Sequence, residues 1–303
     1  MSDIDLYALA ESYGLLFASC ELMVPGVNRT YRLTEGADTY YLRLYRPIGR
    51  SPAEIAFEMR LLRQVRPTPG IDVARPFRTI DGADCAWITF EGVERAAGLF
   101  QGLDGRPIAD DPEDVKLFGS ALAKLHGALT AIEASGARPL DPASLCAKSV
   151  VSLARIPGSE AAWHAINRCR AEMIGDPAAR DLPSGLCHGD ARLANAVARY
   201  GTVGFFDFDD CGCGPYLLDL GTAVWHFVRS DPGKTAALVA ALLAGYEQIR
   251  PLSRKERQAL PHFVKLAEVR ALLFLADFCV LTDDLWLRVL DQATNLLQRE
   301  LVF

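Results

Sequence analysis

The sequence predicts an α+β protein with two lobes: a small antiparallel sheet with one paired helix, and a larger, mainly helical lobe. Segments that alternate apolar and polar residues, as strands do, are concentrated in the first 91 residues. From residue 112 onward, apolar residues recur at helical steps of three and four. A chain of 303 residues is also long for one core and comfortable for two. We therefore expect the lobes to span residues 1–91 and 92–303.

The third strand predicted in the first lobe, residues 39–46, shows the clearest alternation. Leu42 and Leu44 share one face of this strand, so Arg43 points to the opposite face. Glycine and proline residues separate it from its neighbours. The other elements expected in this lobe are a helix at 3–12 and strands at 16–23, 29–34, 74–80 and 84–90.

The paired helix of the first lobe begins with a clear signal. Ser51 to Glu54 form a capping box with proline at the first helical position. Glu58 then falls on or beside the buried stripe of the helix, where a carboxylate needs a partner. Arg43 on the preceding strand is the expected partner.

The second lobe is predicted to be helical apart from one hairpin at 196–208. Asp111 and Pro112 open a helix whose apolar positions recur as far as Ile132. Residues 135–145 are expected to form a surface loop. Long helices are expected to close the chain at 232–249, 254–281 and 283–301.

Charge and composition limit the classes of partner. The formal net charge is −6, which disfavours nucleic-acid binding because that usually needs a basic surface. The acidic start, Met1 to Asp5, lacks the basic and apolar regions of a signal peptide, and no apolar run is long enough to span a bilayer. The 8 cysteines lack zinc-site spacing, which favours buried, reduced thiols. We expect a cytoplasmic protein with no nucleic-acid or membrane partner.

The most specific pattern in the chain is H-G-D-x-x-x-x-N at residues 188–195. Phosphoryl transfer to an alcohol needs a carboxylate that aims the hydroxyl and takes its proton late, and Asp190 can supply one. The amide oxygen of Asn195 can ligate Mg²⁺. Taken singly, Asp190 fits a helix N-cap equally well, and Asn195 fits a turn better than a metal site.

Asp207 lies in an apolar segment, Gly204 to Phe208, that is predicted to be a strand. A carboxylate there is costly unless it is paired or binds a metal, so Asp207 is the second candidate Mg²⁺ ligand. The competing interpretation is a strand-end residue that points to solvent. Asp209 and Asp210 follow, and the sequence assigns neither a role.

Further polar residues accompany this pattern. Asp219 opens an apolar helix, where it could hydrogen-bond the backbone of the 188–195 loop or cap the helix. His188 could brace the same loop through a hydrogen bond. His126 and His226 lie in apolar helical patterns and are interpreted as core histidines with satisfied hydrogen bonds.

The order of these motifs resembles the aminoglycoside phosphotransferase and choline kinase superfamily, which has a protein-kinase-like fold. The H-G-D-x-x-x-x-N element, the segment with Asp207 and the Asp219-Leu220 helix start all match. This resemblance covers most of the chain. Further similarity lies at 41–44, 57–59 and 122–126, and similarity to the type II homoserine kinase-like branch lies at 207–212 and 245–253.

The resemblance implies ATP or another nucleoside triphosphate, with Mg²⁺, as cofactors. It implies a catalytic role for Asp190 and metal binding by Asn195 and Asp207. His188 and Asp219 are then expected to support the loop structurally.

The resemblance also implies a nucleotide-binding role for the first lobe and a catalytic and substrate-binding role for the second. Arg43 is expected to reach the α- and β-phosphates, and Glu58 to position it. Many members of the superfamily have lysine in place of Arg43, and a planar guanidinium can change the phosphate geometry. Ala194 also departs from the pattern, which more often has glycine or a small polar residue. The hinge between lobes, with backbone groups that meet the adenine, is expected at Phe90, Glu91, Gly92 and Val93.

The residues leave four functions open. The first is transfer of phosphate to the hydroxyl of a small molecule, such as an amino alcohol, a homoserine-like or an aminoglycoside-like acceptor. The others are a protein serine/threonine kinase of the bacterial stress-response type, an inactive nucleotide-binding module and a metal phosphohydrolase. Eleven residues between Asp207 and Asp219 leave little room to dock a peptide, which favours a small molecule. The presence of Asp190, Asn195 and Asp207 argues against an inactive module. The pairing of Arg43 with Glu58 and the sheet lobe argue against a hydrolase.

Overall fold

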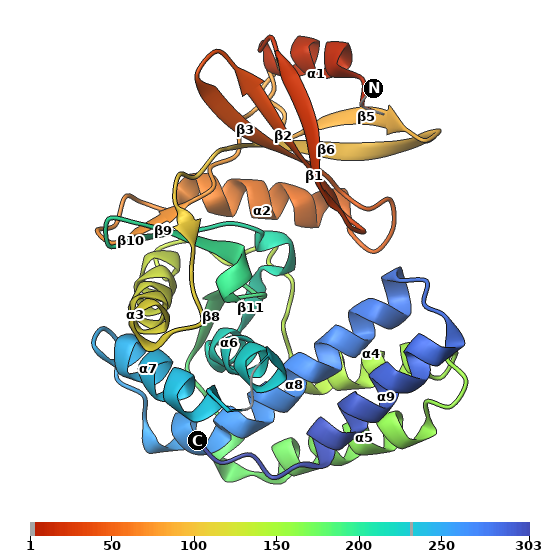
Figure 1. The fold of residues 1–303 in the computed structure, drawn as a ribbon, viewed down its shortest axis with the longest axis vertical. Helices are drawn as coiled ribbons and strands as arrows, with labels where there is room; N and C mark the ends of the chain where they lie inside the picture. Colours follow the sequence, from red (N-terminus) through yellow and green to blue (C-terminus); the bar gives the residue numbers. More distant parts are fainter. Residues whose placement is uncertain (1–3, 231–232) are drawn as a thin grey trace. The chain divides into compact units, whose positions relative to one another are not determined.

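The structure is a computed structural model that describes residues 4–230 and 233–303 (Figure 1). Strands dominate the first part of the chain and helices the part after residue 111, so the predicted α+β class is confirmed. Two predictions fall partly outside the described residues. They are the acidic start from Met1 to Asp3 and the beginning of a helix at residue 232.

The first part of the chain forms an antiparallel sheet with a different helix on each face. The elements are α1 (Leu6–Tyr13), β1 (Ser19–Pro25), β2 (Arg29–Glu35), β3 (Asp38–Leu44), α2 (Pro52–Gln64), β5 (Ala86–Phe90) and β6 (Val93–Gln101), with the strand order β1-β2-β3-β6-β5. Leu42 and Leu44 of β3 join the buried cluster that includes residues of α1. Arg43 points to the α2 face, as the alternation predicts. Gly98, paired with Arg43 across the sheet, leaves room there for Met59 of α2.

Residues 90–93 form the turn of the β5–β6 hairpin. Phe90 pairs with Val93, and the two residues between them, Glu91 and Gly92, have φ values of 51° and 77°. Positive φ at both central positions is typical of a tight hairpin turn. The expectation that these residues form the hinge between the lobes was therefore wrong, because the chain continues into β6, a strand of nine residues in the same sheet.

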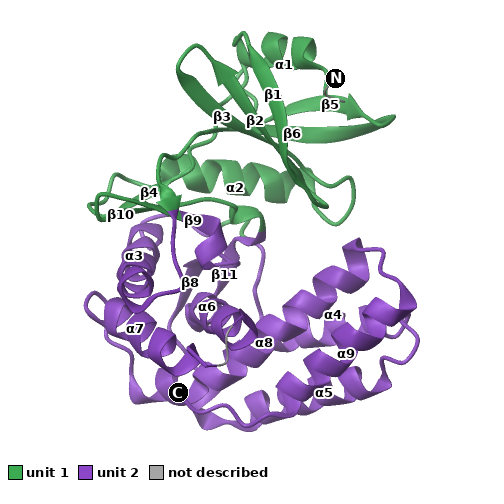
Figure 2. Ribbon diagram, in the orientation of Figure 1, with its two compact units in different colours: residues 1–106, 135–137, 197–209 green, residues 107–134, 138–196, 210–303 purple. Residues whose placement is uncertain are grey.

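The chain folds into two compact units whose limits differ from the predicted 1–91 and 92–303 (Figure 2). The hairpin predicted for the second lobe, β9 (Ala196–Arg199) and β10 (Thr202–Phe205), lies mostly in unit 1. It does so because β10 pairs in parallel with β4 (Ile71–Val73) in a sheet that also contains β7 (Arg106–Pro107). The functional assignment of the two lobes stays a prediction. Unit 1 comprises residues 1–106, 135–137 and 197–209, and unit 2 comprises 107–134, 138–196 and 210–303.

Unit 2 is mainly helical. Its helices are α3 (Pro112–Leu129), α4 (Pro142–Leu153), α5 (Glu160–Gly175), α6 (Leu217–Ser230), α7 (Thr235–Glu247), α8 (Arg254–Phe278) and α9 (Asp283–Gln298), and its short strands are β8 (Ser184–Cys187) and β11 (Gly212–Pro215). The surface loop predicted at 135–145 is shorter than expected, because the Asp141 carboxylate accepts from the Ser144 amide and starts α4. The sequence reasoning also missed α5.

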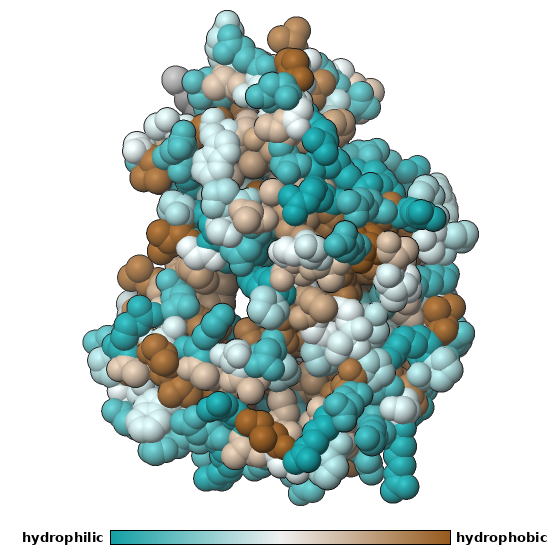
Figure 3. Space-filling view, turned by 180° about the vertical axis from the view of Figure 1, so that it is seen from behind, coloured by the Kyte–Doolittle hydropathy of each residue, from teal (hydrophilic) through white to brown (hydrophobic). Residues whose placement is uncertain are grey.

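The surface carries dispersed hydrophobic side chains. On the face shown in Figure 3, hydrophobic residues lie in small groups among hydrophilic ones. Scattered exposed apolar residues are normal for folded proteins. Among the described residues, no helix is both long enough and apolar enough to cross a membrane.

Candidate active site

Unit 1 contains a buried cluster of charged side chains around Arg43. The Nη1 of Arg43 lies 3.5 Å from Oε1 of Glu58, so the predicted pairing of strand and helix is confirmed. Its Nη2 lies 2.8 Å from Oδ1 of Asp207. The Glu58 side chain is completely buried, and it also accepts a hydrogen bond of 2.9 Å from the Tyr45 hydroxyl. We call Arg43, Glu58 and Asp207 the Arg43 cluster.

The sequence predicted that Asp207 lies inside a strand, but the residue follows the strand. The strand β10 ends at Phe205, and Asp207 has a φ of 65°, which turns the chain out of the extended conformation. The Asp207 side chain is 38% exposed and faces Arg43, so its carboxylate remains accessible to a ligand. The alternative of a residue past the strand end was thus correct about position. The pairing with Arg43 is what separates Asp207 from an ordinary solvated residue.

One guanidinium nitrogen of the Arg43 cluster lacks a hydrogen bond in the part of the chain that the structure describes. The Nη1 of Arg43 is buried and makes no hydrogen bond within the described residues, although it lies near Glu58. Burial lowers the pKa of Arg43, but the neighbouring Asp207 and Glu58 outweigh that effect and raise it, so the guanidinium stays charged. Burial also raises the pKa of Glu58 to about 7, against the attraction of Arg43. A charged, incompletely satisfied guanidinium fits a phosphate group.

Asp209 anchors the segment that follows β10 in unit 1. Its partners are residues that the sequence reasoning did not single out. Its carboxylate lies 2.7 Å from Nη1 of Arg46 and 2.9 Å from Nε of Arg50. The side-chain amide of Asn28 donates to the Asp209 carboxylate at 2.9 Å. Arg50 also lies 3.3 Å from Glu58 and so connects Asp209 to the Arg43 cluster. The signal available in the sequence was the presence of two arginines, Arg46 and Arg50, in the segment after β3.

In unit 2, the 188–195 loop follows β8 and depends on a glycine. Gly189 has a φ of 88°, and a Cβ there would overlap the carbonyl oxygen of Asp210. The loop can approach the Asp210 backbone only because residue 189 has no side chain. This contact fixes the backbone immediately before Asp190.

The side chains of Asp190 and Asn195 lie together, as the spacing predicts. Asn195 donates its amide hydrogens to Oδ2 and to the backbone oxygen of Asp190, both at 2.8 Å. Arg192 donates to the same Oδ2 at 2.5 Å. The Asp190 side chain is 24% exposed, so it is held in place and still open to a substrate. The Oδ1 of Asn195 makes no hydrogen bond within the described residues, which leaves it available to a cation.

Asp219 holds the 188–195 loop through its backbone amides. Of the two alternatives that the sequence left open, loop support and helix capping, the contacts agree with the first. Its carboxylate accepts from the amides of His188 and Gly189, both at 2.8 Å. The Nδ1 of His188 in turn accepts from the Asp190 amide at 3.2 Å, so His188 braces the loop as predicted. Burial raises the pKa of Asp219, but the hydrogen bonds from His126 and Gly189 prevail and hold it below its usual value.

The two remaining acidic residues belong to different units. Asp209 is part of unit 1, whereas Asp210 belongs to unit 2. The Asp210 carboxylate lies 3.1 Å from Nη2 of Arg138 and 3.5 Å from Nη2 of Arg270. His226, expected in the core, is half-buried and lies 3.7 Å from Asp110.

Replacing Gly189 by alanine should be more costly than the same change at another position with positive φ. Gly201, in the β9–β10 turn, has a φ of 75° and open space around it, so alanine there tests backbone strain alone. At Gly189 the overlap with the Asp210 carbonyl adds to that strain. We expect Gly201→Ala to lower the free energy of unfolding by about 1 kcal/mol and Gly189→Ala by about 3 kcal/mol. Urea denaturation measures both values, and equal losses would contradict the close approach.

The fold and the 188–195 loop together define a phosphotransferase of the kinase type. Residues 26–255 match the model of the phosphotransferase enzyme family (APH), and the chain belongs to this family. A homoserine kinase of Neisseria meningitidis serogroup B is 27% identical, over 86% of this chain and 84% of that protein.

Solved structures confirm the protein-kinase-like fold. Amicoumacin kinase, solved with AMP-PNP, Ca²⁺ and Ami, has a TM-score of 0.76 at 18% identity, covering 96% of this chain and 92% of that chain. A microcompartment-associated aminopropanol kinase has a TM-score of 0.73 at 23% identity, covering 96% of this chain and 94% of that chain.

Proposed function

We propose that the protein transfers the γ-phosphate of ATP, with Mg²⁺, to a hydroxyl group of a small molecule. The observation that carries this proposal is that the Asp190 carboxylate is held by hydrogen bonds from Asn195 and Arg192 and is still partly exposed. Little covalent chemistry is required of a kinase, so a fixed carboxylate beside the acceptor hydroxyl is the main demand on this part of the protein.

Asp190 is proposed to orient the acceptor hydroxyl and to accept its proton late in the transfer. The bonds from Asn195 and Arg192 both end on Oδ2. This leaves Oδ1 as the oxygen that meets the acceptor. Asp219 and His188 do not touch the substrate in this proposal, and they keep the loop in shape through its backbone amides.

The nucleotide is proposed to bind through Arg43, whose buried guanidinium contacts the α- and β-phosphates while Glu58 positions it. Asp207 and Asn195 are proposed as the Mg²⁺ ligands, because the Asp207 carboxylate is partly exposed, Oδ1 of Asn195 accepts no hydrogen bond within the described residues, and both are oxygens of the kind that this ion prefers. The bound metal would neutralise charge that develops on the phosphates. Residues 90–93 form a hairpin turn within one sheet, so they have no part in the proposed adenine site.

The acceptor is proposed to be a small molecule with a hydroxyl near an amine. A relative is named a homoserine kinase and a structural neighbour an aminopropanol kinase, and both names denote small hydroxyl compounds with an amine. The segment from Asp207 to Asp219 also supports a small acceptor. It is taken up by a 3₁₀ turn at Phe208–Asp210 and by β11, which pairs with β8. No long stretch of the segment is left to bind a peptide, which a protein kinase must do.

A coupled assay of ATP consumption should identify the acceptor class. We expect turnover with one or more of homoserine, aminopropanol, choline, ethanolamine and an aminoglycoside panel, and none with casein. Product analysis should place the new phosphate on the hydroxyl. Turnover with casein alone would favour the protein-kinase alternative, and ATP loss without any acceptor would favour a hydrolase.

A further inference from the structure

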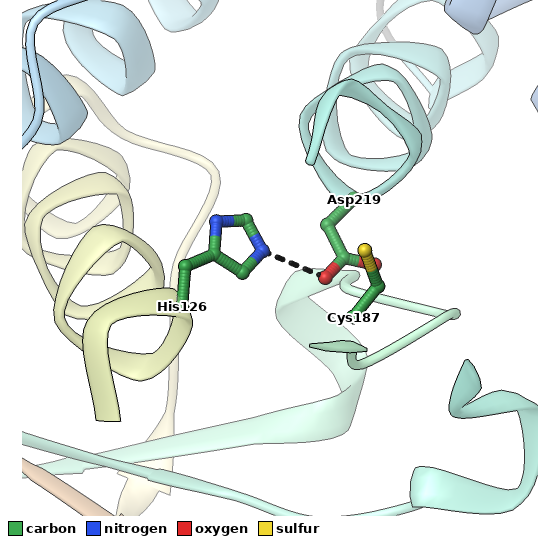
Figure 4. Close-up of side chains that lie close together, drawn as sticks. All are labelled: His126, Cys187 and Asp219. Carbon is green, nitrogen blue, oxygen red and sulfur yellow. Dashed lines mark hydrogen bonds and ion pairs between the residues drawn. The ribbon is translucent and has the colours of Figure 1, made fainter. Parts of the chain in front are cut away.

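His126 of α3 is a buried histidine, as the sequence predicts, but both of its ring nitrogens are engaged. Nε2 lies 2.9 Å from Oδ2 of Asp219, the arrangement seen in Figure 4, and Nδ1 lies 2.8 Å from the Tyr246 hydroxyl. An ionised carboxylate can only accept, so Nε2 carries the proton that bonds Asp219. In the neutral ring, Nδ1 then accepts from the phenol. Burial raises the pKa of Tyr246, so its hydroxyl keeps its proton.

These hydrogen bonds form one chain in which each donor points toward Asp219. Arg250 lies 2.7 Å from Glu256, and its Nη1 donates to the Tyr246 hydroxyl at 3.4 Å. Tyr246 donates to His126, and His126 donates to Asp219. Since Asp219 also accepts the two loop amides, the chain links α7 and α3 to the backbone before Asp190.

Two glycines fix the geometry of this chain. Gly119 of α3 and Gly245 of α7 lie at the crossing of these helices, where a Cβ would overlap the carbonyl oxygens of Leu242 and Lys116, respectively. The two helices can therefore approach closely, and Tyr246, next to Gly245, meets His126. Small residues at a helix crossing permit such backbone contact.

The neighbouring Cys187 offers a competing interpretation, since His126, Cys187 and Asp219 lie close enough together to share a metal ion (Figure 4). Their hydrogen bonds argue against a metal. Both nitrogens of His126 and both oxygens of Asp219 are used within the protein. Burial also raises the pKa of the Cys187 thiol, which favours the protonated form over a thiolate ligand.

We propose that His126 and Tyr246 are positioning residues for phosphoryl transfer. They hold the Asp219 carboxylate in the rotamer that binds the amides of His188 and Gly189, and thereby keep Asp190 aligned. This inference rests on the proposed role of Asp190 in transfer.

The Tyr246→Phe variant tests the proposal with little change in shape. We expect its kcat to fall about tenfold with the KM values for nucleotide and acceptor unchanged, because misplacement of a reacting group affects the rate of transfer. Tyr13→Phe is the matched control, since the Tyr13 hydroxyl is also buried and donates to the carbonyl of Ala97 in unit 1 at 2.7 Å. Each variant loses the bond that its hydroxyl donates and the one that it accepts, which comes from the Ala86 amide at 3.2 Å for Tyr13 and from Arg250 at 3.4 Å for Tyr246. An equal kcat in the two variants would overturn the proposal.

Two variants of His126 separate positioning from packing. His126→Gln keeps an amide that can donate to Asp219 and should retain more activity than His126→Leu, which has no donor. We expect kcat to be higher in the glutamine variant, which keeps a donor, even when the urea midpoints of the two variants agree. If glutamine and leucine give the same kcat at equal stability, His126 has a packing role alone.

Hydrogen exchange provides a readout that does not depend on activity. The amides of His188 and Gly189 should exchange faster in Tyr246→Phe than in Tyr13→Phe, because the Asp219 carboxylate that accepts from them is held less firmly. Unchanged exchange would overturn the link between Tyr246 and the loop. If the wild-type protein transfers no phosphate to any acceptor, the proposed function fails, whereas exchange still decides whether the hydrogen-bonded chain controls the loop.

Discussion

We expect the Asp190→Asn variant to lose about 1,000-fold in kcat while it binds nucleotide as tightly as the wild-type protein. Asparagine has the shape of aspartate but cannot take the proton of the acceptor hydroxyl. It also loses the charge that Arg192 contacts at 2.5 Å. The neighbouring backbone should stay in place, because Asp219 holds it through the amides of His188 and Gly189.

Two measurements test this expectation together. Steady-state assays give kcat with the best acceptor, and calorimetry gives the Kd of the nucleotide. Asp291→Asn is a suitable control, because Asp291 lies exposed on α9 and contacts the side chain of Asn295 at 3.2 Å. Substantial activity in Asp190→Asn would show that this carboxylate is not the catalytic group. A comparable loss of nucleotide affinity would instead indicate a role in binding.

The pairing of Arg43 with Glu58 could be predicted because both ends rest on local signals. The capping box at Ser51 fixes where α2 starts and therefore which face Glu58 occupies. The alternation of β3 fixes the face of Arg43. Where the period of an element is clear, the sequence places a side chain on a face, and the expected partner follows from charge.

The separation of Asp209 from Asp210 could not be predicted in this way. Adjacent in sequence, they join different units because their partners come from distant segments: Arg46 and Arg50 for the first, Arg138 and Arg270 for the second. Nothing local distinguishes the two carboxylates. The hinge prediction for residues 90–93 was wrong for a related reason. A turn after a strand can end a lobe or join two paired strands, and the sequence does not show that β5 pairs with β6 across this turn.

His126 shows a different limit of sequence reasoning. The apolar periodicity of α3 correctly predicts that the histidine is buried. Its hydrogen-bond partners lie 93 and 120 residues away, at Asp219 and Tyr246. A buried polar side chain must be satisfied, but the sequence does not say by what.

We expect the Asp207→Asn variant to bind Mg²⁺ and nucleotide together about tenfold to 100-fold more weakly than the wild-type protein, a loss of about 1.4–2.8 kcal/mol. Asparagine is the informative substitution, because it tolerates the positive φ of 65° at this position better than alanine does. The change therefore removes the charge of the carboxylate and leaves the backbone unstrained.

The same variant should behave in the opposite way when EDTA removes the metal. In the wild-type protein Asp207 lies 2.8 Å from Arg43, where its negative charge competes with a phosphate for the guanidinium. Without that charge, Arg43 is more open to an anion, so the metal-free nucleotide should bind at least as tightly as it does to the wild-type protein. Calorimetric titrations with and without Mg²⁺ provide both values from one preparation. If affinity falls equally under both conditions, Asp207 supports the nucleotide site without holding the metal, and if the Mg²⁺ titration is unchanged, Asp207 is not a ligand. Only a loss confined to the metal-bound form fits a carboxylate that binds Mg²⁺ and otherwise pairs with Arg43.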